Sequence, residues 1–299
     1  MKAINILISI YCCTAMLMAC NAEEEMRESE IKVPLEINIG NGTTRSVIEG
    51  TTIPYQTSFG IIGEYNNQLI NEIGNISVFY DGQCKLSKDV YLDNSSMFIK
   101  AYYPYSSTVD ENIAEIKIQD QVDFLYGSAV NSDGELQVIN SSNPKANIVF
   151  KHALSRITFK VRHTTAYGSD FTLKSVYIDY VGITAFFNLT LQRLTPIKYA
   201  SSTFPLSVFV TKEFTSFDLL LFPTTKHEEW VGAKWIRFRG VKGTLGDITL
   251  EGKWEAGQQY TYEVTFDDNG ITVSKAIITP WESTTQSGID ITDNNLVTD

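Results

Sequence analysis

Cysteine is scarce in this sequence of 299 residues, and three of its four cysteines, Cys12, Cys13 and Cys20, lie within the first 20 positions. Only Cys84 lies in the remainder, so the bulk of the chain has no partner for an intrachain disulfide bond. We therefore expect its stability to come from apolar cores. Hydrophobic residues make up 43% of the chain, and the length is sufficient for two domains of ordinary size.

Positive charge is also in short supply. Lys and Arg together number 24 against 35 Asp and Glu, which gives a formal net charge of −11. Nucleic-acid binding needs basic patches that neutralise phosphates, so this balance argues against a nucleic-acid partner. It equally disfavours adhesion to acidic membranes through charge.

The patterns of familiar catalytic and metal sites are missing. His152, His163 and His227 show neither a metal-ligand spacing nor the spacing of a base beside a nucleophile. The acidic turn at residues 267–269 lacks the ligand spacing of an EF-hand, and turn chemistry accounts for its residues. We expect no catalytic residue, no metal and no cofactor, so the protein is not predicted to be an enzyme. His152 is interpreted as a structural residue at a domain junction. A carboxylate pair assembled from distant strands would leave no such local pattern.

Helical periodicity is almost absent, and short β-branched or aromatic runs take its place. The clearest run lies near the N-terminus, where five branched apolar residues alternate with other residues: Ile31, Val33, Leu35, Ile37 and Ile39. This period of two predicts a strand with one buried face. Pro34 within it has no backbone donor, which favours a position at a sheet edge.

Turn signals separate the runs further along the chain. One hairpin is predicted to turn at Asp81-Gly82 after the strand at residues 76–80. A second is predicted to turn through residues 267–270 after the strand at residues 260–266. Several short strands at this spacing indicate an all-β fold, either a sandwich or a barrel. The most polar stretch, residues 131–147, places a domain boundary near residue 147.

The first 19 residues are typical of a secretory signal peptide. Lys2 precedes an apolar run over residues 3–18 that is too short to span a bilayer comfortably. Leu17 and Ala19 before Cys20 resemble the lipobox of bacterial lipoproteins, although Met18 departs from it. The resemblance implies cleavage before Cys20 and a lipid anchor on that cysteine in the outer membrane. A signal cut nearby without lipidation is the alternative.

The residues after Cys20 indicate a location in the cell. Asn-Ala-Glu-Glu-Glu at residues 21–25 is similar to the acidic tag that sends Bacteroidetes lipoproteins to the outer face of the cell. The resemblance implies a cell-surface location.

Five strings along the chain occur in a characteristic order. They are Thr44-Arg45-Ser46 with the strand at residues 57–63, Asp123-Phe124-Leu125-Tyr126-Gly127, the segment at residues 149–159 that opens Val-Phe-Lys-His, Ala-Gly-Gln-Gln-Tyr-Thr-Tyr at residues 256–262, and Ile-Ile-Thr-Pro-Trp at residues 277–281. In this order they resemble the fimbrillin family, the type V pilins and related surface lipoproteins, and the resemblance covers nearly the whole chain.

The resemblance implies two tandem transthyretin-like Greek-key β-sandwich domains after the lipoprotein signal peptide. The predicted division is a signal peptide at residues 1–19, an acidic tether with a removable first strand at 20–45, an N-terminal sandwich at 46–147, and a C-terminal sandwich with a tail strand at 148–299.

The resemblance also implies a route of assembly. An Arg-specific protease would cut between Arg45 and Ser46 and release the strand that carries Ile31, Val33, Leu35, Ile37 and Ile39. A strand from another pilin subunit, of the same or a different kind, would then fill the opened groove. The lipid-anchored precursor would thereby pass into a fimbrium. Without the resemblance, Arg45 would be interpreted as a surface loop residue beside a permanent strand.

Two questions stay open at this stage. The tail alternates at Ile289 and Ile291, which fits a donor strand and fits equally well a last strand packed in its own domain. The aromatic residues suggest an alternative function, a surface lipoprotein that does not polymerise and binds a host glycan or protein. The residues that prompt it are Tyr102, Tyr103, Tyr105, Tyr126, Trp230 and Trp235. Burial of such residues in sandwich cores is the competing interpretation.

Overall fold

A computed structural model describes residues 32–39, 53–109, 112–224, 234–250 and 253–281 of the chain. Within these ranges the regular structure is β-strand, apart from three short 3₁₀ turns, η1 (Asn71–Ile73), η2 (Ile118–Asp120) and η3 (Thr165–Tyr167). No helix in the described ranges has the length and apolar character needed to cross a membrane. The predicted all-β fold is confirmed.

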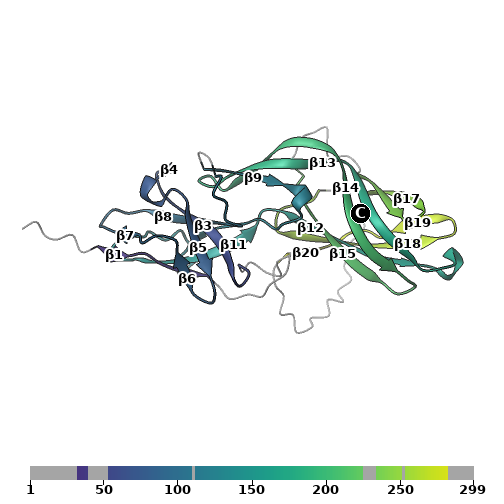
Figure 1. Cartoon of the computed structure of the whole chain (residues 1–299), viewed down its shortest axis with the longest axis horizontal. Helices are drawn as coiled ribbons and strands as arrows, with labels where there is room; N and C mark the ends of the chain where they lie inside the picture. The colour runs from purple at the N-terminus through teal and green to yellow at the C-terminus, as the bar shows by residue number, and fades with distance from the viewer. Residues whose placement is uncertain (1–31, 40–52, 110–111, 225–233, 251–252, 282–299) are drawn as a thin grey trace, which may run out of the picture.

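The first sheet occupies the N-terminal half of the molecule (Figure 1). Its strand order is β2 (Glu36–Ile39), β11 (Lys145–His152), β10 (Leu125–Ala129), β8 (Phe98–Tyr103), β3 (Thr57–Tyr65), β5 (Ile76–Tyr80) and β6 (Cys84–Leu86), with β4 (Gln68–Leu69) beside β3. A separate ribbon pairs β1 (Val33–Pro34) with β7 (Tyr91–Leu92).

The C-terminal half contains two further sheets that face each other. One has the order β15 (Thr215–Leu221), β12 (Ser155–His163), β18 (Gln258–Asp267) and β19 (Gly270–Val273), with β20 (Ile277–Pro280) paired to β18. The other has the order β14 (Arg193–Val210), β13 (Phe171–Asn188), β16 (Lys234–Gly240) and β17 (Gly243–Leu250), with β9 (Ile113–Lys117) paired to β13. The sandwich-like arrangement of sheets agrees with the prediction.

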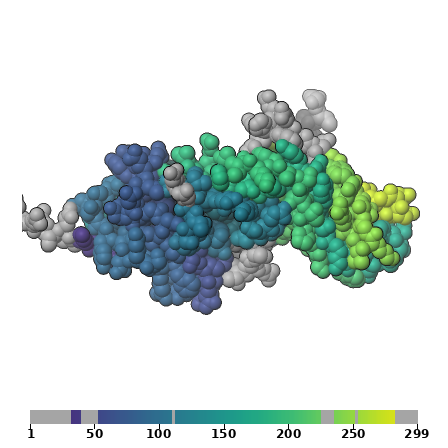
Figure 2. Space-filling view, turned by 45° about the horizontal axis from the view of Figure 1, so that its top comes forward, coloured from purple at the N-terminus to yellow at the C-terminus, as the bar shows by residue number. Residues whose placement is uncertain are grey.

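Two apolar cores stabilise these layers. The first core lies within the first sheet and includes Phe59, whose ring meets that of Phe150 edge to face at 5.6 Å between centroids. The second core fills the C-terminal half around Phe159, and the rings of Phe238 and Tyr262 lie 5.6 and 5.8 Å from it. The molecule is elongated, with the first sheet at one end and β17–β19 at the other (Figure 2).

A long hairpin joins the two halves. Strands β13 and β14 extend toward the first sheet, where the Gln192 side chain at their turn donates to the Gly127 carbonyl at 2.7 Å. The Thr190 carbonyl accepts a hydrogen bond from the Lys100 ammonium, which is also paired with Glu64. Both charged side chains are buried, so this contact fixes the hairpin against β8 and β3.

A buried histidine lies at the same junction. His152 Nδ1 lies 2.9 Å from Asp123 Oδ2, and each side chain is 1% exposed. The Trp281 indole stacks on the imidazole with 3.8 Å between ring centroids. This position agrees with the interpretation of His152 as a structural residue between domains, and it supplies a partner that local spacing does not reveal.

The predicted boundary at residue 147 stays a prediction. Strand β11 (Lys145–His152) runs across that position and remains in the first sheet, whereas β9 precedes it and joins the sheet of β13. Ile62 and Tyr102, from the first sheet, also pack in the second core. The chain therefore contributes to both halves on each side of residue 147.

Candidate functional site

The predicted first strand forms the ribbon strand β1 and the sheet strand β2. Leu35 and Ile37 are 5% and 6% exposed and belong to the first core, while Ile39 packs against it from a half-buried position. Val33 is half-buried, and the intervening residues Lys32, Pro34, Glu36 and Asn38 are exposed. The alternation in the sequence thus becomes one apolar face and one solvent face over the described part of this strand.

Within the first sheet, backbone pairing holds β2 on one side only. Strand β2 runs parallel to β11, with Ile37 opposite Ala146 and Ile39 opposite Ile148. Strand β1 runs antiparallel to β7, with Pro34 opposite Tyr91. Strand β2 stands at one end of the sheet, which agrees with the edge position that Pro34 suggests.

Two backbone hydrogen bonds bridge the pairings of β1 and β2. The amide of Leu35 donates to the Val90 carbonyl at 2.9 Å, and the amide of Glu36 donates to the Pro144 carbonyl at 3.0 Å. Because the strand switches partner at this point, it binds the ribbon and the main sheet together.

The free edge of β2 faces a groove. A cavity of about 400 Å³ lies between this strand and the other end strand of the sheet, β6, with its preceding turn. Its lining includes Ile37 and Ile39 on one side and Tyr80, Cys84 and Leu86 on the other. Since β2 and β6 are the two ends of one strand order, the sheet curves until its edges approach each other without hydrogen bonding.

Cys84 lies half-buried in this groove and is a free thiol. Burial raises the pKa of the Cys84 thiol to about 11, with a smaller contribution from the nearby Asp81 carboxylate. The thiol therefore stays protonated and weakly nucleophilic near neutral pH.

Burial sets the energetic scale of strand removal. Fully burying a Leu or Ile side chain is worth roughly 1.5–3 kcal/mol, so Leu35 and Ile37 together with two half-buried side chains contribute about 5–9 kcal/mol. Loss of the strand would also leave backbone groups of β11 and β7 without partners. The vacated surface would be an apolar slot beside an unpaired edge.

Several predicted site residues lie outside the described residues. They are Cys20, Ile31, Arg45, Ser46, Ile289 and Ile291. Lipidation, cleavage and strand donation at these positions therefore remain predictions. Among the residues that the structure describes, no three His, Cys, Asp or Glu side chains are gathered as a metal site.

The aromatic residues named for glycan binding have mixed positions. Tyr102 is fully buried, and its hydroxyl donates to Asn75 Oδ1 at 2.7 Å. Tyr103, Tyr105 and Tyr126 are half-buried or packed against the cores, so this group does not form an exposed platform. Trp235 is half-buried beneath the Arg237 guanidinium, and Trp230 lies outside the described residues.

Fold and groove together define a class of protein: all-β, with two apolar cores and an N-terminal edge strand that covers part of the first core. A sequence model of the fimbrillin-like family matches residues 44–281. The chain belongs to the fimbrillin-like family, as its motifs indicated. Membership supports a role as a fimbrial subunit or adhesion protein.

Solved structures agree with this fold. A candidate cell adhesion protein from Bacteroides uniformis shares 16% identity at a TM-score of 0.64, over 84% of this chain and 99% of the other. A candidate cell adhesion protein from Bacteroides ovatus shares 19% identity at 0.58, over 84% of this chain and 97% of the other. One from Bacteroides fragilis shares 11% identity at 0.52, over 89% of this chain and 100% of the other. No match was found among curated proteins.

Proposed function

We propose that this protein is a structural subunit of a cell-surface fimbria that assembles by exchange of its first strand. In this proposal Cys20 anchors the precursor to the outer membrane, and an Arg-specific protease cuts between Arg45 and Ser46. The strand carrying Ile31, Val33, Leu35, Ile37 and Ile39 then leaves, and a strand from another subunit replaces it.

The observation that carries the proposal is the pairing of the first strand. The strand pairs with β7 through β1 and with β11 through β2, offers an apolar face to the first core, and borders a groove along the free edge of β2. A strand so placed can leave without breaking the rest of the sheet. Its departure exposes the template that β-strand addition requires.

The replacing strand is proposed to be the tail that carries Ile289 and Ile291. A chain ending at residue 287 would test this, because it retains Trp281 and its contact with His152. If the tail is the donor, the shortened chain accepts a strand from full-length subunits but forms no chains of its own. Polymerisation of the shortened chain alone would assign the donor elsewhere.

The test of cleavage uses an Arg-specific protease on residues 21–299. Mass spectrometry distinguishes a cut after Arg45 from cuts at other arginines, and electrophoresis without heating reports polymers. We expect a cut after Arg45, followed by a ladder of bands on the gel that corresponds to polymers of increasing length. Arg45→Lys is the matched control, since it keeps the charge but removes the protease's preferred residue, and it should give neither.

A disulfide bond engineered between β2 and β11 would hold the first strand in place after cleavage, and so would test strand exchange separately from the cut. Asn38 and Asn147 are opposite each other in β2 and β11, and their side chains hydrogen-bond at 3.1 Å. Asn38→Cys with Asn147→Cys, in a Cys84→Ser background, should allow the cut at Arg45 but prevent the ladder until a reductant is added. A ladder formed by the oxidised, locked protein would contradict strand exchange. It would mean that polymers form with the first strand still in place.

A further inference from the structure

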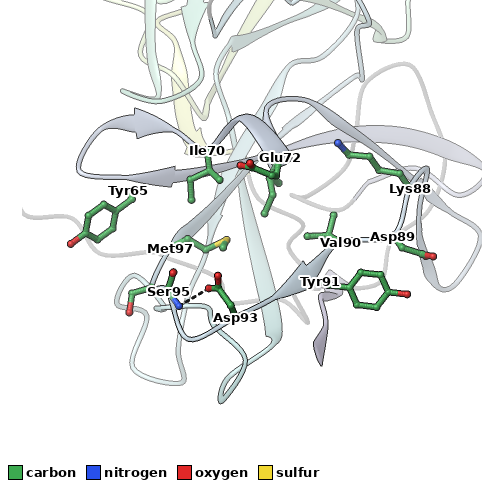
Figure 3. Close-up of a pocket in the computed structure, with 12 residues that line it drawn as sticks. Tyr65, Ile70, Glu72, Lys88, Asp89, Val90, Tyr91, Asp93, Ser95 and Met97 are labelled. Carbon is green, nitrogen blue, oxygen red and sulfur yellow. Dashed lines mark hydrogen bonds between the residues drawn. The ribbon is translucent and has the colours of Figure 1, made fainter. Parts of the chain in front are cut away.

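A second, larger cavity lies in the N-terminal half, beside the ribbon of β1 and β7 (Figure 3). Its volume is about 1020 Å³, at the upper end of the size range of small-molecule pockets. The β3–β4 hairpin and η1 form one wall, and the segment through β7 to β8 forms the other. We call it the ribbon pocket.

The ribbon pocket has an apolar floor between two tyrosines. Ile73, Val90 and Met97 are 2%, 8% and 8% exposed and belong to the first core. Tyr65 and Tyr91, which are 52% and 58% exposed, lie on opposite sides of the cavity (Figure 3). Figure 3 shows both rings directed outward, so they flank the apolar floor at its two margins. Exposed rings in these positions offer flat, electron-rich surfaces to the C–H groups of a ligand.

Local backbone structure holds both tyrosines in place. Tyr65 ends β3 at a tight turn in which Asn66 and Asn67 have φ angles of 51° and 61°, and the Asn67 amide donates to Glu64 Oε1 at 2.6 Å. Positive φ at both central positions is typical of the hairpin turns that match strand twist. Tyr91 is opposite Pro34 in the β1–β7 ribbon. The two rings are therefore presented from regular elements rather than from long loops.

The charged groups of the ribbon pocket are mostly acidic. Glu72, Asp89 and Asp93 line it with a single cation, Lys88, among the described lining residues. Asp93 Oδ1 accepts a hydrogen bond from the Ser95 amide at 2.7 Å (Figure 3). That bond and one from the Ser95 hydroxyl lower the pKa of Asp93, so its carboxylate stays ionised. Carboxylates accept hydrogen bonds from hydroxyl groups and repel anionic ligands.

We propose that the ribbon pocket binds a neutral oligosaccharide. The two tyrosines stack on sugar faces, the apolar floor contacts ring C–H groups, and Glu72 and Asp93 accept hydrogen bonds from sugar hydroxyls. The excess of carboxylates selects against sialylated, uronic and sulfated sugars. All of its described lining residues lie outside the first strand, but Tyr91 pairs with Pro34 of that strand, so the proposal concerns the uncleaved subunit.

The test is a glycan array that contains neutral, sialylated and sulfated oligosaccharides, probed with purified residues 21–299. Calorimetry with the strongest neutral ligand then measures affinities. Tyr65→Ala and Tyr91→Ala should each weaken binding about tenfold or more, as truncation of an aromatic anchor commonly does. Phe209→Ala, on β14 and 57% exposed, is the matched control and should leave the affinity unchanged.

Tyr65→Ala keeps the test independent of strand exchange. Tyr65 does not pair with β1, so this variant should form ladders like the unchanged protein while losing glycan affinity. Absence of neutral glycan binding on the array would overturn the proposal, as would unchanged affinity in both tyrosine variants. Binding of lysine-rich peptides in place of sugars, with the same loss in both variants, would equally overturn it and assign the acidic pocket to a cationic protein partner.

Discussion

Ile37 offers a direct test of how much the first strand contributes. Its side chain is 6% exposed in the first core, opposite the buried Ala146 of β11. Ile37→Ala removes three carbons from a packed site, and such changes cost about 2–5 kcal/mol. Because the groove beside β2 lets neighbouring side chains relax, we expect about 2–3 kcal/mol of the free energy of unfolding to be lost.

Asn38→Ala is the matched control, since Asn38 is the next residue, is exposed, and points to the other face. It loses one exposed hydrogen bond to Asn147, so we expect a cost of about 0.5–1 kcal/mol. Hydrogen exchange of the β11 amides in the uncleaved protein, measured across a urea series, gives both values. Equal losses in the two variants, or a loss below about 0.5 kcal/mol for Ile37→Ala, would refute the burial argument on which strand removal rests.

Other perturbations follow from single contacts. Burial raises the pKa of the Cys84 thiol in the folded protein from 9.0 to about 11. Between pH 9 and pH 11 the thiol therefore loses its proton mainly in the unfolded chain, so the free energy of unfolding falls as the pH rises. Cys84→Ala should reduce that fall, as measured by urea titrations at pH 8 to 11. Lys100→Met leaves Glu64 buried without its cation and should lower the free energy of unfolding by about 3–5 kcal/mol. Adding Glu64→Gln to this variant should restore part of the loss. If the effects of the two substitutions simply add in the double variant, the two side chains are not coupled. His152→Ala removes the partner of buried Asp123 and the ring beneath Trp281. The free energy of unfolding should therefore fall by about 3–5 kcal/mol, and tryptophan fluorescence should shift. An unchanged melting curve would contradict the structural role of His152.

Local patterns in the sequence were sufficient to predict the first strand and the existence of the two hairpins. Alternation at Leu35 and Ile37 predicts their burial, because a strand repeats every two residues. The lengths of the turns were less accurate. Tyr80 pairs with Cys84, so the first hairpin turns through three residues rather than two, with Gly82 at φ 98°. Asp267 pairs with Gly270, so the second is shorter than predicted.

Contacts between distant segments left no local signal. The parallel partner of β2 is β11, more than 100 residues later, and Asp123 approaches His152 from 29 residues away. Spacing around His152 indicated no partner, and the hydroxyl of Ser155, three residues later, donates to the Glu255 carbonyl instead. The ribbon pocket was missed for the same reason. Tyr65 and Tyr91 come to line the same cavity only once the hairpin and the ribbon are folded.

The central claim is that the first strand is exchanged after a cut at Arg45. The most direct measurement adds an Arg-specific protease to residues 21–299 and to the Arg45→Lys variant, with mass spectrometry and unheated electrophoresis. The account predicts a cut after Arg45, loss of the preceding peptide and a ladder of polymers in the unchanged protein alone. A cut at Arg45 that leaves a stable monomer with its first strand still bound would contradict it.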